Sequence, residues 1–88
     1  MVDQPPLLQF PTDYPMKVVG RPSDEFRARV HALMVRHVPD LDNERVSERL
    51  SENGNFLSIS YVIRARSSEQ VIALVNDLKA CDGVLTIL

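Results

Sequence analysis

Hydrophobic and polar residues alternate along two stretches of this chain, which predicts strands with one buried face and one exposed face. The first stretch runs from residue 14 to 20 (YPMKVVG). The second, from 56 to 65 (FLSISYVIRA), is the clearest, because its large apolar side chains share one face and its serines share the other. Weaker patterns predict an edge strand over 44–51, where charged residues discourage unwanted pairing, and a final strand over 84–88.

Two stretches with a helical repeat separate these strands. Ser23 precedes the first as an N-cap, and acidic residues follow it, where negative charge suits the helix dipole. The first helix is expected to end at His37, and its apolar stripe consists of Phe26, Val30, Leu33, Met34 and His37. Ser67 and Gln70 form a capping box for a second helix from residue 68 to 80. This helix is expected to bury Val71, Leu74, Val75 and Leu78.

The connecting segments carry two further signals. Residues 1–13 hold three prolines and predict an extended arm, part of which is expected to lie on the domain through Leu7, Leu8 and Phe10. The Asn53-Gly54 pair is typical of a two-residue type I′ hairpin turn, in which both central residues need a positive φ.

The predicted order is therefore β-α-β-β-α-β. Two interleaved units of this kind form a ferredoxin-like α+β sandwich, a four-stranded antiparallel sheet with both helices on one face. The first and third strands are expected to be central, with the serine-lined side of the third strand open to solvent or to a partner. The predicted organisation is an arm over 1–13 and a single domain over 14–88.

Composition narrows the classes of function. The chain has 88 residues and a net charge of −2, so no overall basic field draws it to nucleic acid or to anionic lipid. The single cysteine, Cys81, excludes an internal disulfide, and one cysteine with two scattered histidines builds no zinc site. No signal peptide and no membrane-length apolar run is present. A cytoplasmic location is the expectation that remains.

The side chains that perform acid–base or nucleophilic chemistry are scattered. His31 and His37 are separated by about 240° around one helix, so they do not converge on a substrate. His37 is expected to contact the carbonyl groups at the end of its helix, and Cys81 to be a half-buried thiol at a helix end. No phosphate loop or dinucleotide fingerprint is present. We therefore expect a protein that is not an enzyme and uses no metal or cofactor.

Basic residues on or beside the predicted open sheet face are a possible binding feature: Lys17, Arg45, Arg49, Arg64 and Arg66. The same topology serves as an RNA-recognition scaffold when aromatic side chains of the central strands stack on bases. Here the only aromatic candidate is Phe56, so a solvated or dimer-forming face is preferred over an RNA platform.

The turn between the first strand and the first helix resembles a binding site most closely. Gly20, Arg21 and Ser23 lie at a helix N-terminus, where unpaired N–H groups and a guanidinium suit a carboxylate or a phosphate. The alternative is a plain capped turn without a ligand.

An ordered series of segments resembles the YbeD-like family of small bacterial proteins. The similarity covers nearly the whole chain after residue 7, and no single motif carries it; the segments are Leu8–Thr12, Lys17–Gly20, Arg36–Pro39, Ser51–Ser60 and Val84–Leu88. The resemblance implies a ferredoxin-like fold similar to the small-molecule-sensing ACT regulatory domains. It implies no catalytic residues, because the family has no established activity; a lipoate-binding regulatory role has been suggested for it.

In ACT-like domains, effectors bind near the first strand–helix turn, often at a dimer interface. The resemblance therefore points to Gly20, Arg21 and Ser23 as ligand-binding residues. The first hypothesis is a homodimeric regulatory module that binds a small carboxylate such as lipoate or an amino acid, or a partner protein. The alternative is an adaptor that binds proteins through the arm and the sheet face. Nucleic-acid binding and catalysis are the less favoured classes.

Overall fold

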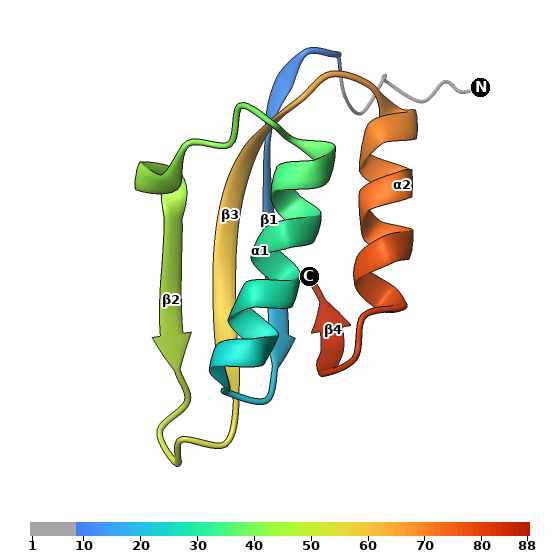
Figure 1. The fold of residues 1–88 in the computed structure, drawn as a ribbon. Helices are drawn as coiled ribbons and strands as arrows, with labels where there is room; N and C mark the ends of the chain where they lie inside the picture. Colours follow the sequence, from blue (N-terminus) through green and yellow to red (C-terminus); the bar gives the residue numbers. More distant parts are fainter. Residues whose placement is uncertain (1–8) are drawn as a thin grey trace, which may run out of the picture.

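The computed structural model describes residues 9–88 (Figure 1). The sheet is built from β1 (Thr12–Gly20), β2 (Val46–Leu50), β3 (Leu57–Ala65) and β4 (Val84–Ile87). The helices are α1 (Asp24–His37), α2 (Ser68–Lys79) and the short 3-10 helix η1 (Asn43–Arg45). Leu7 and Leu8, expected to hold the arm to the domain, lie outside the described residues; Phe10 is half-buried and packs against the core.

The sheet order is β2-β3-β1-β4 and every neighbouring pair is antiparallel. The long ladder between β1 and β3 pairs Thr12 with Ala65 and Gly20 with Leu57 at its two ends. Both helices lie on the same side of the sheet (Figure 1). The predicted ferredoxin-like α+β sandwich, with the first and third strands central, is confirmed.

The core lies between the sheet and the two helices. Alternate residues of β1 and β3 point into it, as the period of two requires, and the buried stripes of α1 and α2 cover them. The fully buried side chains with the largest volumes are Tyr61, Phe26, Met34, Leu57, Ile63, Leu74, Leu78, Val18, Val30 and Val38. Burial of this apolar surface is the main favourable contribution to folding.

The helix starts follow the sequence signals. The Ser23 hydroxyl accepts from the Phe26 backbone N–H at 2.9 Å, and the Ser67 hydroxyl accepts from the Gln70 N–H at 3.1 Å. The reciprocal half of the capping box differs, because the side-chain oxygen Oε1 of Gln70 accepts from the backbone N–H of Arg66, one residue before the N-cap. The Gln70 amide also donates to the His37 carbonyl at 2.8 Å. Gln70 therefore links the start of α2 to the end of α1.

The starts of two strands differ from the sequence predictions by more than one residue. β1 begins at Thr12, so Thr12 and Asp13 belong to the sheet and not to the arm. Residues 44 and 45 lie in η1, and β2 occupies only Val46–Leu50.

The two-residue turn predicted at Asn53-Gly54 is wrong, because residues 51–56 form a wider loop between β2 and β3. The Ser51 hydroxyl accepts from the backbone N–H groups of Asn55 and Phe56, while the Ser51 N–H donates to the Phe56 carbonyl at 2.8 Å. Gly54 keeps the positive φ, 75°, that the pattern indicated.

β4 is short and covers only part of β1. Lys17 and Leu88 exchange backbone hydrogen bonds of 3.0 and 2.8 Å, so the nitrogen of Lys17 faces β4. Two residues earlier, the Pro15 nitrogen faces the same side, and proline has no N–H to offer to a further strand. Pro15 thereby discourages strand addition where β4 ends.

Candidate functional site

The turn that the sequence analysis favoured is tightly packed at Gly20, whereas Arg21 and Ser23 are exposed. Gly20 is buried, and a Cβ atom there would overlap the Gly83 carbonyl oxygen and the Phe26 ring. The glycine is therefore needed for the close approach of the β1 end to the turn before β4. The Ser23 hydroxyl is already used as the cap of α1. Of the three predicted ligand-binding residues, only Arg21 presents an exposed polar group without a partner in the described part of the chain.

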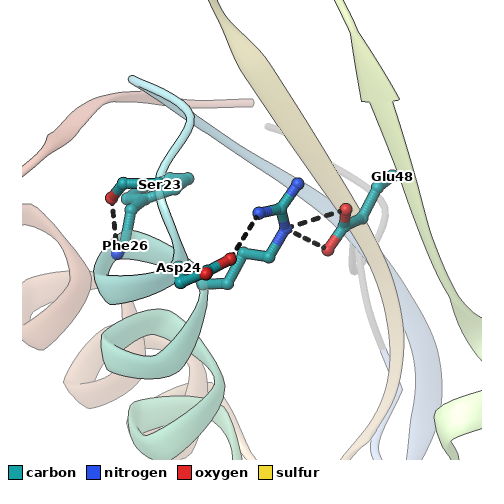
Figure 2. A network of polar contacts seen from close by, with 5 residues as sticks. Ser23, Asp24, Phe26 and Glu48 are labelled. Atoms are coloured by element: carbon teal, nitrogen blue, oxygen red, sulfur yellow. Dashed lines mark hydrogen bonds and ion pairs between the residues drawn. The ribbon is translucent and has the colours of Figure 1, made fainter.

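The first turn of α1 is also tied to the sheet edge. Figure 2 shows the Ser23 cap beside a guanidinium, that of Arg27, which lies between Asp24 and Glu48. The Arg27 Nε lies 3.1 Å from both Glu48 carboxylate oxygens, and its Nη1 lies 3.2 Å from the Asp24 Oδ1. Since Glu48 belongs to β2, this cluster joins α1 to the edge strand on the helix-covered side. The Arg27 guanidinium is occupied by these two carboxylates, so it is not available to bind an anion.

A more open hollow lies between the two helices. It is a groove of about 530 Å³ lined by Arg29, Ala32, Leu33 and Arg36 of α1 and by Asp77, Ala80, Cys81 and Asp82 at the end of α2. The small side chains Ala32 and Ala80 leave the space, and charged side chains surround it. Within residues 9–88, no ion pair joins Arg29 or Arg36 to a carboxylate.

The sequence predicted that His37 contacts the carbonyl groups at the end of its own helix, and this prediction is wrong, because the ring contacts Asp77. Its Nε2 lies 2.7 Å from the Oδ2 of Asp77, because α1 and α2 pack side by side and place the two residues opposite each other. Asp77 therefore has one side against His37 and the other toward the groove. The histidine side chain is largely buried in this contact.

Cys81 is half-buried, as predicted, and lines the groove with Asp77. Its thiol contacts the carbonyl of the neighbouring Asp82 at 3.6 Å. Catalysis by a cysteine requires a base that takes the thiol proton, and no His ring contacts this sulfur in the described residues. Asp77, which lines the groove with Cys81, is the carboxylate that contacts His37.

The sequence analysis missed this groove. Arg29 and Arg36 are seven residues apart and therefore share one face of α1, with Ala32 between them, which is a visible signal. The opposite wall comes from α2, more than forty residues later, and only the packing of the helices brings it there.

The open sheet face carries a second polar cluster. Arg45 places Nη1 and Nη2 at 3.2 and 3.0 Å from the two Asp13 oxygens, and Arg64 places Nη1 at 3.5 Å. The hydrogen bond from Arg45 and the nearby guanidinium charges hold the pKa of Asp13 below its usual 3.8. The same carboxylate raises the pKa of Arg45. Arg66 leaves this face, because it pairs with Asp40 at 3.2 Å.

Among residues 9–88, no three His, Cys, Asp or Glu side chains gather where a metal ion would bind. No helix in that part of the chain combines the length and the apolar character needed to cross a bilayer.

The fold places the chain among ACT-like ferredoxin sandwiches. The ACT domain from GTP pyrophosphokinase of Chlorobium tepidum superimposes with a TM-score of 0.65 at 13% identity, over 86% of this chain and 84% of that domain. The C-terminal domain of the MgtC protein from Mycobacterium tuberculosis gives a TM-score of 0.64 at 15% identity, over 93% and 89% of the two chains. At these identities the likeness concerns the fold alone.

The sequence comparisons identify the family. Residues 5–88 match the family described as protein of unknown function, DUF493. A UPF0250 protein of Ectopseudomonas mendocina is 43% identical over 86 residues, covering 97% of this chain and 94% of that protein. A UPF0250 protein of Hahella chejuensis is 36% identical over 83 residues, covering 94% and 91%. The chain belongs to this bacterial family, and the family resemblance and ACT-like fold inferred from the sequence are confirmed.

Proposed function

We propose that this protein is a non-catalytic regulatory module that binds a small carboxylate ligand in the groove between α1 and α2. The groove supports the proposal, because it brings the guanidinium groups of Arg29 and Arg36 beside the small side chains of Ala32 and Ala80. Guanidinium groups bind carboxylates through paired hydrogen bonds. The ACT-like fold supports a regulatory role.

The charges of the groove favour an amino acid over lipoate. Asp77 and Asp82 line the wall opposite the arginines, so the groove presents both signs of charge. An α-amino acid carries a carboxylate for the arginines and an ammonium for the aspartates, whereas lipoate carries only the first. Both remain within the class of small carboxylates that the sequence suggested.

This location replaces the turn of Gly20, Arg21 and Ser23 as the first choice. The glycine there is covered and the serine is engaged, so that turn supplies only Arg21. Two arginines that lie along one hollow hold a ligand better than one exposed arginine, since each charged hydrogen bond adds to the affinity.

A thermal-shift screen with the amino acids and lipoate at millimolar concentration tests the proposal. A ligand that binds only the folded protein raises the melting temperature, and the shift grows with ligand concentration. We expect the shift to disappear in Arg36→Gln and to persist in Arg21→Gln, which is the matched control at the turn. A shift lost only in Arg21→Gln would move the site to the turn. The absence of any shift would reject the small-ligand function.

A further inference from the structure

The open face of the sheet concentrates positive charge on an acidic protein. The register assigns Asp13, Lys17, Arg49 and Arg64 to the side away from the helices, and Arg45 joins them through Asp13. We call these residues the basic face. Four cations against one carboxylate give this face a net charge of +3, whereas the whole chain carries −2. The remaining surface is therefore strongly acidic.

Hydroxyl groups lie between the cations of the basic face. Lys17 is opposite Ser60 on β3, and Arg49 is opposite Ser58 on the other edge of the same strand. Ser60 is in turn opposite Ser47 of β2. Two cations thus flank a row of small side chains that donate hydrogen bonds, and in the described part of the chain neither cation has a carboxylate partner.

From this arrangement we infer that the basic face binds a short acidic segment of a partner protein. Lys17 and Arg49 supply the charge, and Ser58 and Ser60 supply hydrogen-bond donors to the partner's carboxylates. The small serines let an extended segment approach the sheet closely. The exposed ring of Phe56 at the end of the face adds an apolar contact.

The charge distribution argues against two other occupants. Two copies of this chain stacked face to face would oppose two surfaces of +3, and like charges at an interface are costly. A single-stranded nucleic acid needs aromatic platforms on the central strands, and none of the outward residues there is aromatic: Asp13, Pro15, Lys17, Val19, Ser58, Ser60, Val62 and Arg64. A long polyanion would also meet the exposed acidic residues at the two ends of β2, Asp42, Glu44 and Glu52. A short acidic segment avoids them.

Fluorescence anisotropy with a labelled peptide of alternating glutamate and serine tests the inference. We expect binding at low ionic strength that weakens as salt is added, because exposed charges are screened. Lys17→Glu and Arg49→Glu should each weaken binding about tenfold, since each removes an attractive charge and adds a repulsive one. Lys79→Glu makes the same change on α2 and should alter the affinity by less than about twofold. Circular dichroism confirms that each variant is folded.

Four results would overturn the inference. The peptide fails to bind at low salt, or Lys79→Glu weakens it as much as Lys17→Glu does, which would show a response to net charge alone. Oligouridylate binds more tightly than the peptide under the same conditions, which would make the face a nucleic-acid surface. Sedimentation shows a dimer that Arg49→Glu dissociates, which would make the face a contact between copies. None of these variants lies in the helix groove, so the test is independent of the small-ligand function.

Discussion

His37 of α1 and Asp77 of α2 lie 2.7 Å apart, Nε2 to Oδ2, and form a side-chain contact between the two helices. A second contact joins the same residues' helices, because the side-chain amide of Gln70 donates to the backbone carbonyl of His37. The last turn of α1 is therefore held to α2 at two points. Because Asp77 also lines the groove, the position of a groove residue depends on this contact.

Replacing Asp77 by alanine should lower the free energy of unfolding by about 1 kcal/mol, since the largely buried His37 ring then lacks its partner. Urea unfolding followed by circular dichroism measures the change. Asn76→Ala is the control, because Asn76 is exposed on the same helix and should change stability by less than about 0.5 kcal/mol. Equal losses in both variants would show that the contact does not stabilise the protein.

Gly20→Ala should destabilise the protein by about 3 kcal/mol, because the added methyl group overlaps the Gly83 carbonyl oxygen and the Phe26 ring. Gly54→Ala separates this effect from backbone strain. Gly54 has open space around its Cβ position but a φ of +75°, so the loss there should be about 1 kcal/mol. Chemical denaturation of the two variants gives the comparison. A loss at Gly20 no larger than that at Gly54 would contradict the close packing at the end of β1.

Tyr61 should make the protein sensitive to alkaline conditions. Burial, followed by the nearby Glu48 charge, raises the pKa of Tyr61 from 10.0 to about 12. A raised pKa means that the folded state favours the neutral phenol. The stability that the neutral Tyr61 phenol contributes is therefore fully present below pH 10 and is lost as the pH rises from 10 to about 12. The loss should be on the order of 2–3 kcal/mol.

The measurement for Tyr61 is denaturant unfolding at several pH values within that window. Tyr61→Phe removes the ionisable group and should lose less stability there than the wild-type protein does. Tyr14→Phe, which changes the other tyrosine of the chain, should retain the full wild-type loss. An alkaline loss that is the same in all three proteins would assign the effect to other groups.

The Asp13 carboxyl should titrate below its usual pKa of 3.8, because Arg45 binds both of its oxygens and Arg64 lies close by. Arg45→Gln should raise this pKa toward 3.8, and NMR titration of the side-chain carboxyl resonance measures it. Arg66→Gln is the control, since Arg66 pairs with Asp40 and not with Asp13. An Asp13 pKa unaffected by Arg45→Gln would mean that the pair does not persist in solution.

The sequence by itself determined the order of elements, the buried faces and the helix starts. These follow from periods of two and 3.6 residues and from caps such as Ser23 and Ser67, which act over a few neighbouring residues. The ferredoxin-like topology followed because only a few arrangements of this order have right-handed crossovers.

Contacts between distant segments were decided only by the tertiary structure. The wide loop at 51–56 is a local exception, in which the Ser51 hydroxyl accepts from the backbone N–H groups of Asn55 and Phe56. The sequence predicts Gly20 as part of a ligand site, and the tertiary structure adds that Gly83 and Phe26 approach this residue too closely for any side chain. The helix groove and the basic face each combine residues far apart in the chain. Local patterns carry no information about such pairs, because packing fixes them only when the layers meet.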